Sequence, residues 1–347
     1  MFATIAHAPA LNALDRAIDG DRPAHAYVFV GPEGVGKGTA ALEFAAALNC
    51  QAERSERPCG VCRSCRDTLA GTHPDVELVA PGGLCDESDH KDHNDSRDLR
   101  ICQIRRLERV LSLAPYGGGH RVAIIDAADS LHAESANAFL KTLEEPPDGT
   151  IIILLVEREE RLPETVMSRC QRITFRRLPI ETIVETLRSR GADEPTALTI
   201  ASIAAGRIGW ALRALQDPGM LDERSSTLDE AVTIAHAGRV ERFAWAKGSE
   251  GRQEARERYA RILDLWETWW RDVLAASAGA TDAFMNRDRT AVLLEEGKLY
   301  ATDEIVRLLR AIAATKEHLL ANVDPQLALE NLTLDLPQPG RATAGRR

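Results

Sequence analysis

The residues with the clearest chemical potential lie between a short apolar run and a helical pattern. The run Tyr27–Val30 leads into Gly31-Pro32-Glu33-Gly34-Val35-Gly36-Lys37-Gly38-Thr39, and the pattern Ala40–Leu48 follows. A glycine-rich turn lets backbone N–H groups approach phosphates, the helix N-terminus adds positive potential, and a lysine reaches the outer phosphates. The segment therefore predicts a phosphate-binding loop.

This loop lacks groups that a working ATPase needs. The motif places Ser or Thr directly after the lysine to bind magnesium, but Gly38 stands there, and Thr39 is rotated by about 100° around the helix. A second apolar run, Val122–Ile125, ends in Asp126, which could assist a metal through water. Active ATPases continue with a glutamate that polarises the attacking water, whereas here Ala127 follows. We expect no hydrolysis, and binding of ATP and Mg²⁺ stays open at a degenerate nucleotide site of Gly31, Gly34, Gly36, Lys37, Thr39 and Asp126.

Four cysteines at short spacing form a second candidate site: Cys50, Cys59, Cys62 and Cys65. Four thiolates close a tetrahedral zinc shell and leave no open position, so the spacing predicts one structural Zn²⁺ per chain. The charged residues between the cysteines argue against a coincidence of core thiols. A run of acidic and histidine residues at 86–95 could also bind a cation, but such runs are more often solvated loops.

The elements that must position these groups alternate in type over the first half of the chain. Short β-branched runs separated by helical patterns predict a parallel sheet with helices on its faces. The candidate strands are Tyr27–Val30, Val76–Val79, Val122–Ile125, Ile151–Val156 and Ile173–Phe175. After residue 179 the pattern is helical, with Ile180–Leu215 broken at Gly206, and a long helix at Glu254–Leu274. The latter carries an apolar stripe that predicts a helix-packing core: Leu265, Trp266, Trp269, Trp270 and Val273.

Composition limits the class of protein. The chain has 347 residues, which favours two or three domains, and its net charge of −10 argues against holding nucleic acid by its overall field. No apolar run approaches the roughly 20 residues that span a bilayer. The start, Met1–His7, lacks the pattern of a secretory signal, and clustered cysteines suit a reducing compartment, so we expect a cytoplasmic protein without membrane contact.

One helical segment, Ser135–Pro147 (SANAFLKTLEEPP), closely resembles the signature of bacterial clamp-loader subunits, the gamma/tau and delta-prime family. His25-Ala26-Tyr27, Ser168-Arg169-Cys170 and the ending Asn322–Glu330 resemble the same family, and many members carry a zinc module after the first helix. The resemblance implies an α/β AAA+ P-loop domain at 1–176, with a five-stranded parallel sheet and a zinc module at about 50–65. A small helical lid domain would follow at 177–245 and an all-α collar at 246–336, and the composition of the last segment (PQPGRATAGRR) predicts a disordered tail at 337–347.

Departures from the gamma/tau pattern favour the delta-prime type, which keeps the fold but lacks the residues for ATP hydrolysis. Besides Gly38 and Ala127, the fourth strand ends in Val156-Glu157 where a threonine is expected. Gly209 stands where an arginine is expected, although that alignment could slip toward Arg207.

The resemblance also implies partners. They are the gamma/tau and delta subunits of a ring, the sliding clamp (beta) and primer–template DNA. Arg169 would reach in trans to the ATP of a neighbouring subunit, unless it forms a local ion pair, for example with Glu164. Two rival readings are an ATP-hydrolysing gamma/tau-like subunit, which Gly38 and Ala127 disfavour, and a zinc-dependent DNA-binding module, which the net acidity disfavours.

Overall fold

A computed structural model describes residues 7–20, 23–85, 96, 98–117, 119–247, 252–321 and 323–338. The predicted acidic and histidine run at 86–95 lies outside these ranges, as do residues 339–347 of the predicted tail. The chain divides into two compact units. The first comprises Met1–Thr182 and Gly206–Trp210, and the second comprises Ile183–Ala205 and Ala211–Arg347. The three predicted domains and their boundaries stay a prediction.

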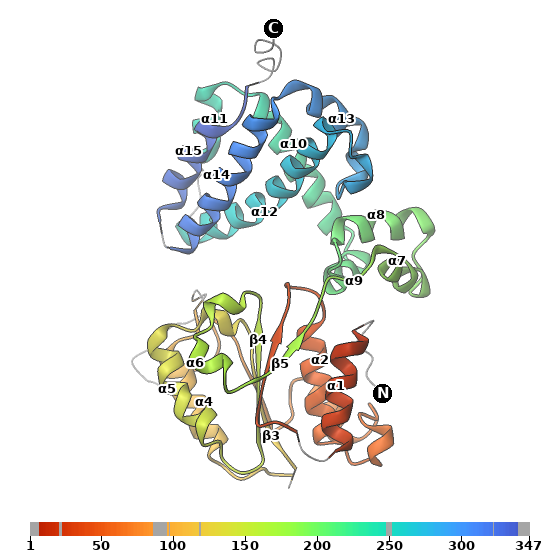
Figure 1. Ribbon diagram of the computed structural model, residues 1–347, viewed down its shortest axis with the longest axis vertical. Helices are drawn as coiled ribbons and strands as arrows, with labels where there is room; N and C mark the ends of the chain where they lie inside the picture. The colour runs from red at the N-terminus through yellow and green to blue at the C-terminus, as the bar shows by residue number, and fades with distance from the viewer. Residues whose placement is uncertain are drawn as a thin grey trace. The chain divides into compact units, whose positions relative to one another are not determined.

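The described residues form five strands and fifteen α-helices (Figure 1). The strands are β1 (Ala26–Val30), β2 (Val76–Val79), β3 (Arg121–Ile125), β4 (Thr150–Val156) and β5 (Gln171–Thr174). The helices are α1 (Ala8–Asp19), α2 (Lys37–Leu48), α3 (Arg63–Leu69), α4 (Ile101–Leu111), α5 (Ala133–Glu144), α6 (Glu164–Met167), α7 (Ile180–Ser189), α8 (Glu194–Ala204), α9 (Ile208–Gln216), α10 (Gly219–His236), α11 (Arg239–Lys247), α12 (Arg252–Ser277), α13 (Thr290–Leu299), α14 (Thr302–Leu320) and α15 (Pro325–Asp335). None of the helices within the described ranges has the length and hydropathy needed to cross a membrane.

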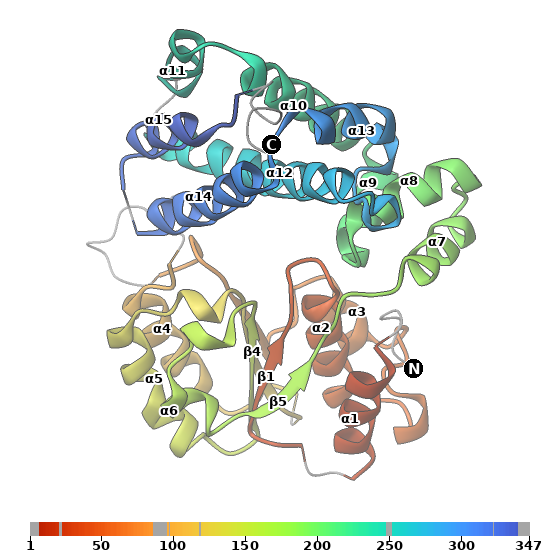
Figure 2. The same ribbon diagram turned by 45° about the horizontal axis from the view of Figure 1, so that its top comes forward.

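The strands form one parallel sheet in the order β2-β3-β4-β1-β5, which confirms the predicted five-stranded parallel sheet. Strand β1 therefore lies between β4 and β5, as Figure 2 shows. Its last residue, Val30, pairs with Val156 of β4. The fifth strand ends one residue before the predicted Ile173–Phe175, but the N–H of Phe175 still donates to the carbonyl of Val30 at 2.7 Å.

Both faces of the sheet are covered by helices, because consecutive strand residues point to opposite sides. Helices α1 and α2 lie on one face and α4, α5 and α6 on the other (Figure 1). Tyr27 of β1 packs with Phe44 of α2, their ring centroids 5.2 Å apart. The alternate residue Val28 belongs to the core on the other side, with Phe139 of α5. This burial on both faces fixes the position of β1 and therefore the position at which the following loop begins.

The region predicted as one helix with a single break, Ile180–Leu215, has two breaks. The predicted break at Gly206 is present, and a second separates α7 from α8 at Gly191, where φ is +96°. Asp193 then caps α8 by accepting the N–H of Thr196 at 3.0 Å. Apolar periodicity continues across both helices, so only the glycine and the capping residue carry the signal for this break.

The second unit has an aromatic core, as the stripe on the long helix predicted. Trp266, Trp269 and Trp270 of α12 are each 1% exposed, and Val273 is fully buried. Residues of α10, α11, α13, α14 and α15 share this core. The tryptophans are thus packing residues rather than a surface for stacking bases.

A buried arginine joins the end of the described chain to this core. The guanidinium of Arg242, in α11, donates to the carbonyls of Ile234 and Ala235 at the end of α10, at 3.1 and 2.6 Å. The same group donates to the carbonyls of Leu336 and Pro337, which follow α15, at 3.1 and 3.3 Å. Helix C-termini leave carbonyl groups without intrahelical partners, and here one cation serves two such ends.

Candidate functional site

The loop between β1 and α2 depends on its glycines. A Cβ at Gly31 would lie 2.2 Å from the carbonyl oxygen of Phe175, so no larger residue fits beside β5. Gly34 and Gly36 have φ values of +73° and +107°, in the left-handed region that glycine adopts without strain. The sequence therefore builds a strand, a tight glycine turn and a helix that begins at Lys37.

Lys37 is folded back against the start of this loop. Its Nζ donates to the carbonyls of Gly31 and, at 2.9 Å, Pro32, and the residue is 8% exposed. Desolvation lowers the pKa of the ammonium, while four nearby carboxylates raise it, in the order Glu157, Asp126, Asp129 and Glu33. The lysine is thus a buried positive group at the mouth of the loop.

The magnesium side of the site lacks the expected donors. A Cβ at Gly38 would meet only Leu155 Cδ1, at 3.9 Å, so the missing hydroxyl is not excluded by space. Thr39, one residue further along α2, is exposed. The Asp126 carboxylate accepts the N–H of Ala127 at 2.9 Å, and Ala127 has a left-handed φ of +48°. No carboxylate occupies the position after Asp126, so the site has the Lys37 cation but no base directly after Asp126.

Two residues considered for the missing arginine lie beside the loop. The N–H of Gly209 donates to the carbonyl of Gly34 at 2.7 Å, and a Cβ at Gly209 would lie 3.0 Å from that oxygen. Arg207 also lies close to Gly34, and its guanidinium lies over the ring of Trp210, 5.9 Å from the centroid. Close packing therefore accounts for glycine at position 209.

His7 contacts the loop and was not predicted from the sequence. Its Nε2 donates to the carbonyl of Val35 at 2.8 Å, and its ring packs edge-on to Phe175 with centroids 5.0 Å apart. Burial lowers the pKa of the imidazole, and the bond to Val35 partly offsets this effect. A single histidine before an amphipathic helix has no spacing that would have revealed this contact.

Arg169 follows the short helix α6 and is 34% exposed. Its Nη1 donates to the carbonyl of Thr165 at 2.7 Å, and its Nη2 donates to Oε1 of Glu144. Arg169 therefore forms an intrachain ion pair, the alternative considered from the sequence, but the partner is Glu144 rather than Glu164. Glu144 ends α5, which packs against α6, and this proximity in space cannot be read from sequence spacing.

The four cysteines come together after α2. One sulfur atom from each lies within 4.8 Å of the other three, and the Cys50–Cys62 and Cys59–Cys65 sulfur pairs are each 4.0 Å apart. Zinc–sulfur bonds of about 2.3 Å in a tetrahedron require sulfur–sulfur distances of roughly 3.8 Å. The cluster can therefore hold one metal ion.

Backbone N–H groups favour the thiolate form of two of these cysteines, Cys59 and Cys62. The N–H of Cys62 donates to the sulfur of Cys59 at 3.3 Å, and the N–H of Cys65 donates to that of Cys62 at 3.4 Å. Backbone N–H groups of Cys62 and Val61 lower the pKa of Cys59 to about 6, whereas burial raises the pKa of Cys65 to about 12. Thiolate is the form that binds metal, so the donor set and its hydrogen bonds fit a sulfur-ligated ion.

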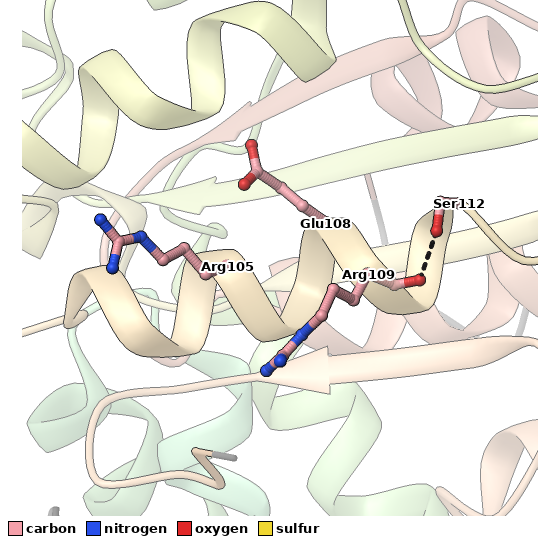
Figure 3. Close-up of a pocket in the computed structure, with 4 residues that line it drawn as sticks. All are labelled: Arg105, Glu108, Arg109 and Ser112. Atoms are coloured by element: carbon pink, nitrogen blue, oxygen red, sulfur yellow. Dashed lines mark hydrogen bonds between the residues drawn. The ribbon is translucent and has the colours of Figure 1, made fainter. Parts of the chain in front are cut away.

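A pocket elsewhere in the first unit includes none of the predicted site residues. Figure 3 shows that its labelled residues all come from α4 and its end: Arg105, Glu108, Arg109 and Ser112. The Ser112 hydroxyl donates to the carbonyl of Arg109 at 2.7 Å. The side chains that line it are mainly charged.

One family model and several curated proteins match this chain. The model of the family described as "DNA polymerase III, delta subunit" matches residues 6–179, half of the chain. DNA polymerase III subunit delta' of Bacillus subtilis is 27% identical over 329 residues, covering 94% of this chain and 95% of its own. Subunit tau of the same organism is 32% identical over 226 residues, which is 65% of this chain but 36% of the tau chain. Among solved structures, a DNA polymerase III gamma subunit-related protein from Thermotoga maritima matches with 17% identity and a TM-score of 0.44, covering 94% of this chain and 97% of its own.

Proposed function

Because this chain belongs to the DNA polymerase III delta subunit family, we propose that it serves as the delta-prime subunit of a bacterial clamp loader. In that role it helps a ring with gamma/tau and delta subunits open the sliding clamp (beta) and place it on primer–template DNA in the cytoplasm. The observation that carries the proposal is the delta' relative, which aligns with 94% of the chain. The absence of a hydroxyl at Gly38 and of a carboxylate at Ala127 supports a subunit that does not hydrolyse ATP itself.

The active contribution of this subunit is Arg169, acting on the ATP of a neighbouring gamma/tau subunit. A guanidinium is always charged and forks onto phosphate oxygens, so it stabilises the charge that develops during phosphoryl transfer. The ion pair with Glu144 does not prevent this role. Arg169 is 34% exposed and Glu144 50%, and exposed pairs contribute only about 0–1 kcal/mol, so a phosphate can displace the carboxylate.

The cysteine cluster holds a structural zinc ion in this proposal. Cys50, Cys59, Cys62 and Cys65 would supply four thiolates and leave no site for water, so the ion supplies cross-linking rather than catalysis. It would join the end of α2 to α3, since Cys50 follows α2 and Cys65 lies in α3. The zinc ion would thereby stabilise the C-terminal end of α2, the helix that begins at Lys37.

The proposal is tested with the complex reconstituted from this chain, gamma/tau, delta and the clamp. Arg169→Ala should leave assembly intact and lower DNA-stimulated ATP hydrolysis and clamp loading. Removing an arginine finger costs roughly 10³–10⁵-fold at one site, but only one site of the ring is affected, so total hydrolysis should fall in part. Arg169→Lys should restore little, because an ammonium lacks the planar fork.

Arg172→Ala is the matched control, since Arg172 is also an exposed arginine, three residues along the chain, paired with Glu159 at 2.8 Å. Its hydrolysis and loading rates should equal those of the unmodified complex. Unchanged rates with Arg169→Ala would reduce Arg169 to an intrachain ion pair. Failure of the chain to co-purify with gamma/tau and delta would overturn the proposed function itself.

A further inference from the structure

Glu157 lies at the start of the phosphate loop. It directly follows Val156, the last residue of β4, whose carbonyl accepts the N–H of Gly31 at 3.0 Å. Gly31 and Pro32 are also the residues whose carbonyls hold the Nζ of Lys37. The sheet register and the lysine contacts therefore bring one acidic and one basic side chain to the same end of the loop.

The two side chains act on each other electrostatically. Among charged groups, Glu157 contributes most to the pKa of Lys37, and Lys37 contributes most to that of Glu157. Desolvation raises the pKa of the Glu157 carboxyl, and the Lys37 ammonium and the backbone N–H of Glu33 both lower it. An ammonium and a loop amide are the two kinds of group that such a loop offers to phosphate.

We propose that Glu157 determines the ligand specificity of this loop: its carboxylate takes the place of a nucleotide phosphate beside Lys37 and the Glu33 N–H, and so excludes nucleotides. The proposal deepens the proposed function and rests on it for the view that this subunit works without its own ATP. It gives a reason why nucleotides do not bind, which the residues Gly38 and Ala127 do not give. Those positions affect magnesium and hydrolysis, whereas Glu157 acts on the binding of the phosphates themselves.

Charge repulsion gives the exclusion its strength. A nucleotide phosphate placed next to Lys37 would lie near the Glu157 carboxylate, and Asp126, Asp129 and Glu33 add negative charge around the same lysine. Like charges held at the same site repel each other, so a phosphate beside Lys37 binds more weakly while the Glu157 carboxylate is present. Replacing Glu157 by glutamine keeps the size and the hydrogen-bonding oxygen but removes the charge that acts most strongly on Lys37.

The test measures ADP binding to the full chain by isothermal titration calorimetry, with and without Mg²⁺. Glu157→Gln should bind ADP roughly tenfold or more tightly than the unmodified chain. Adding Lys37→Met to Glu157→Gln should abolish the gain, which shows that the nucleotide occupies the loop. Glu157 is exposed, so thermal unfolding should show that the single variant keeps its fold.

Glu160→Gln is the matched control, because Glu160 is an exposed glutamate three residues along the chain. It should bind ADP no better than the unmodified chain. Equal affinities of the unmodified chain and Glu157→Gln, tight ADP binding by the unmodified chain, or an equal gain with Glu160→Gln would each overturn the proposal. None of these results depends on subunit assembly or on the Arg169 measurements. A failure of the Glu157 proposal can therefore be distinguished from a failure of the proposed function.

Discussion

At the position after Lys37, the structure has room for the side chain that the sequence lacks. A Cβ on Gly38 would touch only Leu155, at 3.9 Å. Packing therefore does not impose glycine there, in contrast to Gly31, where a Cβ would lie 2.2 Å from a backbone oxygen. The loop keeps the glycines that shape it and lacks the hydroxyl that would make it an enzyme.

The isolated chain should accordingly show no ATP hydrolysis above background. It lacks the magnesium-binding hydroxyl at Gly38 and the water-polarising carboxylate at Ala127. Steady-state phosphate release from purified protein is the measurement, with Lys37→Ala as the control for contaminating enzymes. Turnover that disappears in Lys37→Ala would show that the chain is an ATPase after all.

Some residue contacts could be predicted and others could not. The glycine loop, the cysteine spacing and the buried tryptophans follow local rules, so the sequence predicted them. The Glu144 partner of Arg169 and the contact of His7 with Val35 join residues 25 and 28 positions apart. Such pairs depend on how helices pack, and one sequence without relatives holds no signal for them.

At the scale of elements, the strands were more predictable than the helix ends. Val76–Val79 was predicted with its bounds, and four further runs were placed within about two residues, because buried parallel strands are continuous apolar runs. The second break in Ile180–Leu215 was missed, because apolar spacing continues through Gly191. The cysteine module is a small element of its own, and its stability should depend on metal.

Protein purified without added metal should contain about one zinc ion per chain, because four thiolates complete a tetrahedral shell. Cys62→Ser should lower the zinc content to near zero and make the segment around residues 50–65 sensitive to protease. Cys85→Ser, outside the cluster, should retain the ion. Elemental analysis and limited proteolysis are the measurements, and reduced, folded protein with no zinc would rule out the site.

At the scale of the whole molecule, the chain is stabilised by contacts between residues that lie far apart in the sequence. Arg242 joins α11 to the residues that follow α15, and it is 5% exposed. Five backbone carbonyls accept its hydrogen bonds: those of Ile234, Ala235, Thr333, Leu336 and Pro337. Buried acceptors that lose their donor carry a desolvation cost.

Arg242→Met should therefore destabilise the second unit by about 2–4 kcal/mol, since methionine fills similar space without donors. Urea unfolding followed by tryptophan fluorescence is the measurement, because four of the five tryptophans lie in that unit. Arg239→Met, at an exposed position of the same helix, should change stability by no more than about 0.5 kcal/mol. Equal effects of the two substitutions would show that the carbonyl contacts contribute little.

The strand order determines when the sheet can form during synthesis of the chain. Strand β1 ends at residue 30, but its two neighbours end at residues 156 and 174. The ribosome must therefore extend the chain by more than a hundred residues before either edge of β1 can pair, and pairing over such separations is slow. We expect β1 to emerge as an apolar strand without partners. The first unit would then depend on chaperones until β5 has left the ribosomal tunnel. The glycine loop, which hangs from β1, would be among the last parts of that unit to take shape.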